Sequence, residues 1–258
     1  MKILTKSFIF LCLLVLFAFS LPKKPVRIFL IGDSTMADYT LDSGYMDKKF
    51  PLHGWGQVFQ PFFRKDSLSK VKKLIGSDSV IILDKARGGR STRTFFEEGR
   101  WAAVYKALKK NDLVMIQFGH NDAAVDKPER YVNIAGYKEY LRLYVNQTRE
   151  KEAIPILITP VNRNYPWKDG KLSNVHGEYP NAVKDVAKEL NVRLIDLTQL
   201  SIAAFTAKGQ DEVTSTYFMN LEKGIYKGYP VGQKDNTHFQ KAGALAVAQL
   251  VFNAMKGL

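Results

Sequence analysis

The stretch Val26–Thr35, VRIFLIGDST, joins a run of apolar and β-branched residues to a glycine, an acid and two hydroxyl side chains. The run VRIFLI at Val26–Ile31 is typical of a strand that is buried on both faces, as in a parallel sheet. Gly32 permits a sharp turn where a side chain would clash. Ser34 is therefore expected at the carboxyl end of a first strand, where α/β proteins place reactive groups.

Four further apolar runs predict the rest of a sheet, at Val80–Leu83, Leu113–Phe118, Ile154–Thr159 and Val192–Ile195. Amphipathic stretches alternate with them and predict helices at Trp55–Phe63, Trp101–Lys109, Tyr137–Lys151, Asn181–Leu190 and Lys241–Met255. This alternation indicates a central parallel sheet of about five strands with helices on both faces, a three-layer α/β/α sandwich. Two long polar segments, 160–178 and 209–237, fit neither pattern and are expected as functional loops over one edge of the sheet.

The first twenty residues have the composition of an export signal. Two lysines precede the unbroken apolar run Phe8–Phe19, which ends in the triplet AFS at Ser20. The run is shorter than the roughly 20 apolar residues that a membrane-spanning helix needs, although a membrane anchor is the alternative. Cys12, the only cysteine, lies inside the run and not at a lipoprotein cleavage point. We therefore expect a signal peptide at residues 1–20 and a single domain over 21–258, in a secreted or periplasmic protein.

Composition narrows the chemistry of the mature chain. Loss of residues 1–20 would remove the only cysteine, which excludes a thiol nucleophile, a thiolate metal site and a disulfide. The formal net charge of +13 becomes +11 when Lys2 and Lys6 leave with the signal. Such a surface suits an acidic polymer, nucleic acid or an anionic membrane, or is simply solvated. Export makes nucleic acid the least suitable of these partners.

Candidate reactive groups follow the predicted strands. A serine hydroxyl needs an adjacent base, and the base needs an acceptor that orients it. Asp235 and His238, just before the last predicted helix, have a spacing that can bring a carboxylate to an imidazole. Gly89 follows the second strand and Asn121 the third, and both can donate hydrogen bonds to an oxyanion. Each alone also fits a turn, a loop glycine or a helix cap, but their combination at one sheet edge favours an acyl-transfer site.

The chain resembles the GDSL/SGNH hydrolases over about residues 26–248. The four sequence blocks of that family appear in order as Gly32-Asp33-Ser34, Gly89, Gly119-His120-Asn121-Asp122 and Asp235-Asn236-Thr237-His238. The resemblance implies an SGNH, flavodoxin-like fold without a metal ion or an organic cofactor. Ser34 would be the nucleophile, His238 its base and Asp235 the acid that orients the base. The Ser34 N–H, the Gly89 N–H and the Asn121 side chain would form the oxyanion hole.

Finer motifs are similar to the rhamnogalacturonan acetylesterase branch of this family. They are Gly32-Asp33-Ser34-Thr35-Met36-Ala37, Gly89-Arg90-Ser91-Thr92-Arg93, Glu98-Gly99-Arg100-Trp101 and Phe118-Gly119-His120-Asn121-Asp122. The branch implies removal of acetyl groups from an acidic pectic polysaccharide, which suits a basic exported protein. We expect a monomer that binds neither nucleic acid nor, once the signal is removed, a membrane. A lipase or lysophospholipase, a xylan acetylesterase and a non-catalytic carbohydrate-binding protein are the alternatives.

Further candidates for substrate contact are Asp33, His53, Arg90, His120 and Trp167. The aspartate would alternatively order the turn, and both histidines have packing roles as alternatives. Arg87 and Arg93 share with Arg90 the capacity to bind a uronate carboxylate through two parallel hydrogen bonds, or to remain solvated. His176 lies in a polar loop and is expected to be exposed.

Overall fold

The computed structural model describes residues 24–258 and is built around a five-stranded parallel sheet. Its strands are β1 (Val26–Gly32), β2 (Val80–Asp84), β3 (Leu113–Gln117), β4 (Ile154–Ile158) and β7 (Arg193–Ile195). They lie in the order β2-β1-β3-β4-β7, which is the flavodoxin-like order. The predicted strands are confirmed, each to within one residue at either end. The signal peptide expected at residues 1–20 lies outside the described residues.

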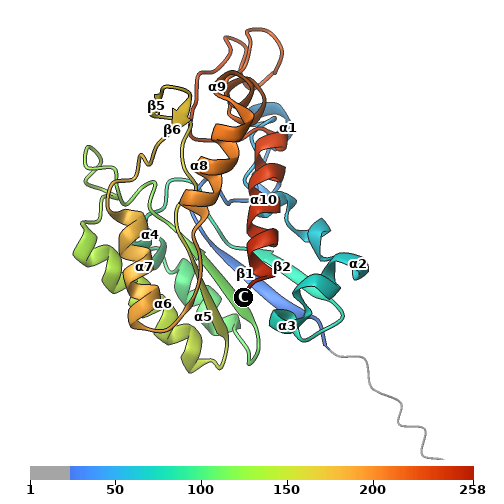
Figure 1. Cartoon of the computed structure of the whole chain (residues 1–258), viewed down its shortest axis with the longest axis vertical. Helices are drawn as coiled ribbons and strands as arrows, with labels where there is room; N and C mark the ends of the chain where they lie inside the picture. Colours follow the sequence, from blue (N-terminus) through green and yellow to red (C-terminus); the bar gives the residue numbers. More distant parts are fainter. Residues whose placement is uncertain (1–23) are drawn as a thin grey trace, which may run out of the picture.

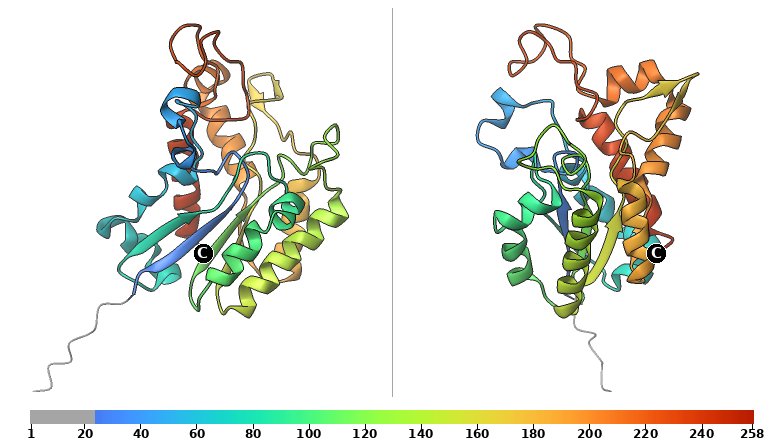
Figure 2. Two further views of the ribbon diagram at one scale, coloured as in Figure 1. Left: turned by 180° about the vertical axis from the view of Figure 1, so that it is seen from behind. Right: turned by 90° about the vertical axis from the view of Figure 1, so that its left-hand side faces the viewer.

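Helices cover both faces of the sheet, so the expected three-layer sandwich is confirmed (Figure 1, Figure 2). One face carries α4 (Thr92–Glu97), α5 (Arg100–Ala107), α6 (Ile134–Glu150) and α7 (Tyr179–Glu189). The other carries α8 (Leu197–Lys208), α10 (Lys241–Met255), η2 (Gly56–Val58), η3 (Gln60–Phe63), α2 (Lys65–Leu68), η4 (Ser69–Val71) and α3 (Lys72–Ile75). None of the helices in residues 24–258 is both long and apolar enough to cross a membrane.

Several elements differ from the sequence-based expectation, and the short helices α2, α3 and α4 had no prediction. The helix predicted at Trp55–Phe63 is a pair of short 3₁₀ turns, because Gly56 and Pro61 at their starts disfavour a continuous α-helix. Helix α8 had no prediction. It begins directly after β7, and its apolar residues are spread around the helix, so that its sequence shows no clear amphipathic period.

Alternate side chains of β1 pack into two separate cores. Ile28 and Leu30 face the layer of α8 and α10, whereas Phe29 and Ile31 face the layer of α5 and α6. All four are at most 1% exposed. Full burial of such a side chain contributes about 1.5–3 kcal/mol. Burial on both faces is the physical reason for the continuous apolar run that marks this strand in the sequence.

The two long polar segments lie over the carboxyl edge of the sheet (Figure 1). Segment 160–178 contains the hairpin of β5 (Trp167–Lys168) and β6 (Lys171–Leu172), and segment 209–237 contains α9 (Gln210–Glu212) and the π-helical turn η5 (Val213–Tyr217). At the same end lie η1 (Tyr39–Leu41) and α1 (Tyr45–Lys48). Asn164 joins the two segments, because its backbone N–H donates to the Asn236 carbonyl at 2.8 Å and its amide to Asn236 Oδ1 at 2.9 Å.

Gly32 lets β1 turn immediately beside the end of β3. A Cβ at this position would lie 2.5 Å from the carbonyl oxygen of Gln117, which is closer than non-bonded atoms approach. The turn that carries Ser34 therefore fits against the neighbouring strand only because residue 32 has no side chain.

His176 is buried, and the expectation that it is exposed was wrong. Its side chain is covered by other residues of its own segment, 160–178, and Nε2 donates to the Val161 carbonyl at 3.0 Å. The ring also packs edge-on against His120, with 4.5 Å between the ring centroids. Burial lowers the pKa of His176 well below its ordinary value, and the positive potential of Arg163 acts in the same direction.

We expect the substitution Gly32→Ala to lower the free energy of unfolding by about 1–3 kcal/mol, because the new methyl group must displace the end of β3. Gly88→Ala is the matched control, since a Cβ there would meet no atom closer than 3.6 Å. Urea unfolding of both variants measures the difference. Equal stability of the two variants would contradict the proposed crowding at Gly32.

His176→Gln should weaken the dependence of stability on pH between pH 7.5 and 5. The unfolded chain binds a proton at His176 near its ordinary pKa, whereas the folded chain does not. The wild-type protein therefore loses stability as the pH falls below about 6.5, by up to about 1.4 kcal/mol per pH unit from this group. Urea unfolding at both pH values should show that the stability of wild type relative to the variant decreases on acidification. Parallel pH profiles would exclude this contribution.

Candidate active site

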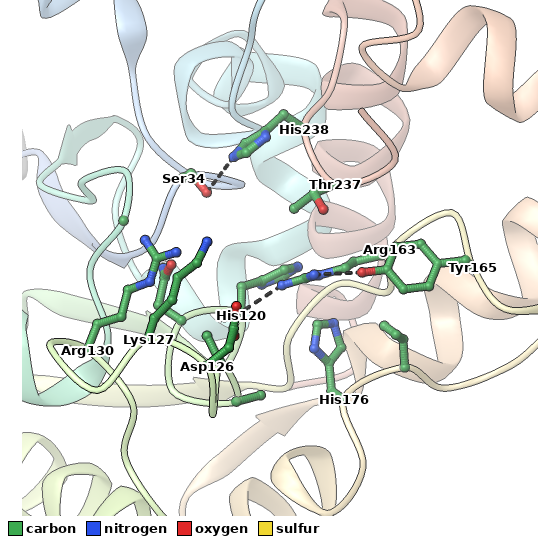
Figure 3. Close-up of a pocket in the computed structure, with 15 residues that line it drawn as sticks. Ser34, His120, Asp126, Lys127, Arg130, Arg163, Tyr165, His176, Thr237 and His238 are labelled. Carbon is green, nitrogen blue, oxygen red and sulfur yellow. Dashed lines mark hydrogen bonds between the residues drawn. The ribbon is translucent and has the colours of Figure 1, made fainter. Parts of the chain in front are cut away.

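A pocket of about 460 Å³ opens where the strand order reverses (Figure 3). The reversal lies between β1 and β3, and sheets of this type bind ligands beyond the carboxyl ends of the strands at that point. Ser34 follows β1, Gly89 follows β2 and Asn121 follows β3. All three line the pocket together with His238. The strand register thus brings together residues that are far apart in the sequence.

Ser34, His238 and Asp235 form a hydrogen-bonded chain. His238 Nε2 lies 2.9 Å from Ser34 Oγ, and His238 Nδ1 lies 2.7 Å from Asp235 Oδ2. The other oxygen, Asp235 Oδ1, accepts the backbone N–H groups of Thr237 at 2.8 Å and of His238 at 3.0 Å. An ionised Asp235 accepts from Nδ1–H and leaves Nε2 as the acceptor for the serine hydroxyl.

Asp235 is suited to remain ionised in this arrangement. Burial alone would raise the pKa of its carboxyl group. The neighbouring His238 and the two backbone N–H groups outweigh burial and hold the pKa below its ordinary value. A carboxylate at this position fixes both the tautomer and the orientation of the imidazole.

Three residues that line the pocket offer hydrogen-bond donors, namely the N–H groups of Ser34 and Gly89 and the side-chain amide of Asn121. Within residues 24–258, neither the Ser34 N–H nor the Gly89 N–H donates to a protein acceptor. Gly89 has a φ of 81°, a conformation that favours glycine. Asn121 Nδ2 donates to the Arg90 carbonyl at 2.9 Å. Because an amide NH₂ group has two hydrogens, one remains for a ligand.

Asp33 and His120 form a buried pair beneath the serine. Asp33 Oδ1 accepts from the N–H and the hydroxyl of Thr35 at 2.9 and 2.8 Å, and Oδ2 lies 3.1 Å from His120 Nδ1. Burial would raise the pKa of Asp33, but His120 and Thr35 lower it below its ordinary value. Asp33 thus orders the turn, which is the alternative that the sequence left open. His120 lines the pocket, although its side chain is almost fully buried.

Asp122 is an organising residue to which the sequence assigned no role of its own. Its Oδ1 accepts from the N–H and the hydroxyl of Thr92 at 2.9 and 2.6 Å, and its Oδ2 accepts from the Gly119 N–H at 3.1 Å. Burial raises the pKa of Asp122 to about 7, against the hydrogen bonds from Thr92, which lower it. The side chain connects the start of α4 to the turn that carries Asn121.

His53 does not line the pocket. Its Nδ1 lies 2.8 Å from the Pro51 carbonyl oxygen, and its side chain is buried among aromatic rings. The backbone N–H of His53 donates to the Phe239 carbonyl at 2.8 Å. His53 therefore packs, and its main chain supports the segment that carries His238.

Arg90 and Trp167 also lie outside the pocket lining. Arg90 pairs with Glu98 at 3.0 Å, and its guanidinium group donates to the Gly88 carbonyl at 2.8 Å. The side chain thus holds the loop that carries Gly89. Trp167 is half-buried in β5 and donates from Nε1 to Asn164 Oδ1 at 2.9 Å.

The other two arginines weighed with Arg90 have protein partners as well. Arg87 forms an ion pair with Asp42, and Arg93 forms one with Glu97 at 3.2 Å. The positive charges that do line the pocket are Lys127, Arg130 and Arg163. The first two lie in the loop after β3, where no motif of the sequence singled them out. In the described part of the chain, no group of three or more His, Asp or Glu side chains is placed to hold a metal ion.

Comparison with known proteins identifies the family and two similar relatives of this chain. Residues 28–251 match the family model of the GDSL-like lipase/acylhydrolases. The chain is 36% identical over 236 residues to the rhamnogalacturonan acetylesterase RhgT of Bacillus subtilis, with 92% of each chain covered. It is 40% identical to a probable rhamnogalacturonan acetylesterase of the same organism, YesY, over 90% of this chain and 93% of YesY.

A solved structure shows the same fold. The crystal structure of YxiM from Bacillus subtilis superposes with a TM-score of 0.71 at 28% identity, over 91% of this chain and 57% of that one. The family resemblance and its rhamnogalacturonan acetylesterase branch, both inferred from short motifs, are confirmed over most of the chain. The chain belongs to the GDSL-like lipase/acylhydrolase family.

Proposed function

We propose that this esterase removes acetyl groups from an acetylated pectic polysaccharide of the rhamnogalacturonan type. The observation that carries the proposal is the hydrogen-bonded chain from Asp235 through His238 to Ser34, which opens into a polar pocket. Relatives with names for this activity share 36% and 40% identity with the chain. The mature enzyme acts outside the cytoplasm after loss of residues 1–20, a proposal that rests on the composition of the leader.

The geometry supports an acyl-enzyme mechanism. Ser34 Oγ attacks the acetyl carbonyl carbon while His238 Nε2 takes the hydroxyl proton. The carbonyl oxygen becomes an oxyanion and accepts hydrogen bonds from the Ser34 N–H, the Gly89 N–H and Asn121. The tetrahedral intermediate collapses, the bond to the sugar oxygen breaks, and His238 returns the proton to that oxygen. Water then attacks the acetyl-serine with His238 again as the base, and acetate leaves.

The pocket favours a sugar ester over a lipid ester. Of its fifteen lining residues only Ala123, Ala124 and Val175 are aliphatic, and the others are glycine or carry polar, charged or aromatic groups. A long acyl chain needs extended apolar surface for burial, whereas sugars bind through polar groups. A non-catalytic carbohydrate-binding role would leave the ordered Asp235–His238–Ser34 chain without a use.

Ser34→Ala should lower acetate release from acetylated rhamnogalacturonan by about 10⁴-fold or more, because the nucleophile is lost. The matched control is Ser69→Ala, since within residues 24–258 the exposed Ser69 hydroxyl donates only to the Asp66 carbonyl of its own turn. Purified mature protein is assayed on this polymer, on acetylated xylan and on a long-chain p-nitrophenyl ester. Ser34-dependent activity on the long-chain ester alone would move the enzyme to the lipolytic class, and unchanged turnover in the variant would refute the nucleophile.

Asn121→Ala should reduce kcat on the same polymer by about 10²–10³-fold and change KM little, because the donor acts on the developing oxyanion. The side chain also bonds to the Arg90 carbonyl, so thermal unfolding of the variant must accompany the kinetics. Asn253→Ala, an exposed change on α10, is the control. A proportional rise in KM at constant kcat would instead place Asn121 in ground-state binding.

A further inference from the structure

Three positive side chains point into the pocket that holds Ser34 and His238. Figure 3 shows Lys127 and Arg130 extending toward the serine, and Arg163 reaching in from the segment after β4. Asp126 is the one acidic residue of the lining. Lys127, Arg130, Arg163 and Asp126 together therefore carry a formal charge of +2. The chain thus presents net positive charge next to its reactive hydroxyl.

These cations lack the acidic partners that other arginines of the same sheet edge have. Arg163 donates to the Tyr165 hydroxyl at 2.7 Å and to the His120 carbonyl at 3.2 Å, and within residues 24–258 it forms no ion pair. Arg130 has one acidic neighbour, the exposed Glu129, at 3.9 Å. Lys127 has no side-chain acceptor among the described residues. The charge in the pocket is therefore left largely uncompensated by the protein.

An anionic ligand would supply the missing partner. Arg130 and Arg163 are each half-buried, and the buried Nε atoms of both have no acceptor in the described part of the chain. A partly desolvated guanidinium group without a counter-ion is unfavourable. Its planar fork of donors matches a carboxylate, which accepts two parallel hydrogen bonds. The ammonium group of Lys127 adds a second charge of the same sign.

The position of Arg130 brings such a carboxylate close to the scissile ester. Its Nη1 lies 3.6 Å from the place that a Cβ would occupy at Gly89, the residue whose N–H is proposed to bind the oxyanion. A group bound by Arg130 lies next to the Gly89 loop, in the same pocket that Ser34 and His238 line. The anion would therefore belong to the acetylated sugar or to its direct neighbour in the chain.

We propose that Lys127, Arg130 and Arg163 form a carboxylate subsite that selects acetyl esters on or next to a uronosyl residue. The inference rests on the proposed acetylesterase function and adds the residues that read the charge of the substrate. Arg87, Arg90 and Arg93, which the sequence offered for this task, have partners within the protein. The two sets differ in how close an acidic partner lies, since the acidic partners of Arg90 and Arg93 lie at 3.0 and 3.2 Å and the one acidic neighbour of Arg130 lies at 3.9 Å.

The test compares two substrates that differ at one carboxyl group, the charged acetylated methyl galacturonoside and its uncharged methyl ester, with released acetate as the readout. The wild-type enzyme should show a kcat/KM at least about ten-fold higher on the charged form. Arg130→Gln and Lys127→Gln should each reduce the ratio of the two kcat/KM values by about ten-fold. Arg142→Gln, on α6, is the control for loss of one positive charge, because it breaks only surface pairs with Glu139 and with Glu189 of α7.

Two results would overturn the subsite. Equal kcat/KM values on the two substrates in the wild type would mean that the enzyme does not recognise the carboxylate charge of the substrate. Equal losses on both substrates in Arg130→Gln and Lys127→Gln mean that these cations act on the oxyanion or on folding instead. Rising salt should also lower the rate on the charged substrate more than that on the neutral one, because ions screen the attraction.

A binding measurement separates this inference from the proposed function. The Ser34→Ala protein cannot turn over, so calorimetry with unacetylated methyl galacturonoside reports the subsite alone. Binding that is about ten-fold weaker for the neutral methyl ester, and lost when Arg130→Gln is added, supports the subsite even if no acetate release is found with the wild type. Equal affinity for both compounds would refute the subsite while Ser34-dependent acetate release still stood.

Discussion

The position of Ser34 depends on a chain of buried hydrogen bonds beneath it. Trp55 Nε1 donates to Gln117 Oε1 at 2.9 Å, Gln117 Nε2 donates to Thr35 Oγ1 at 2.8 Å, and Thr35 Oγ1 donates to Asp33 Oδ1 at 2.8 Å. All four side chains are fully buried. An unsatisfied polar group in such surroundings costs about 1–3 kcal/mol, so each member holds its neighbours in place. The network connects the end of β1 to the end of β3 and to the segment before η2, and the nucleophile has little freedom to move.

A second buried acid, Asp122, fixes the turn that carries Asn121, one of the donors proposed for the oxyanion. Asp122 joins the Gly119 turn to Thr92, and the Arg90 carbonyl accepts from Asn121. Donors that are held in this way need no reorganisation when negative charge develops on the substrate, which is the main source of their catalytic effect. The protein thus places buried carboxylates beneath the site as a scaffold and leaves the pocket itself positively charged.

The sequence predicted the strands well, and the candidate residues that it singled out, Ser34, His238 and Asp235, lie together in the fold, for a physical reason. Strands buried on both faces must be continuously apolar, and the residues that follow them carry distinctive types, as at Ser34 and His238. Candidate substrate contacts were harder to infer, because the sequence does not indicate whether a carboxylate of the protein neutralises a given lysine or arginine. Arg90 is neutralised by Glu98, whereas Arg163 is not. Only the folded arrangement separates the two cases.

The bond between Ser34 and His238 joins residues 204 positions apart in the chain. The base lies just before α10, so the reactive pair forms only after nearly the whole chain has folded around the sheet. Contacts of such long sequence separation form late and slowly, because the entropy of closing the intervening chain must first be overcome. We therefore expect hydrolytic competence to be among the last properties that the folding chain acquires, so that a chain lacking only α10 and the segment before it would be without it.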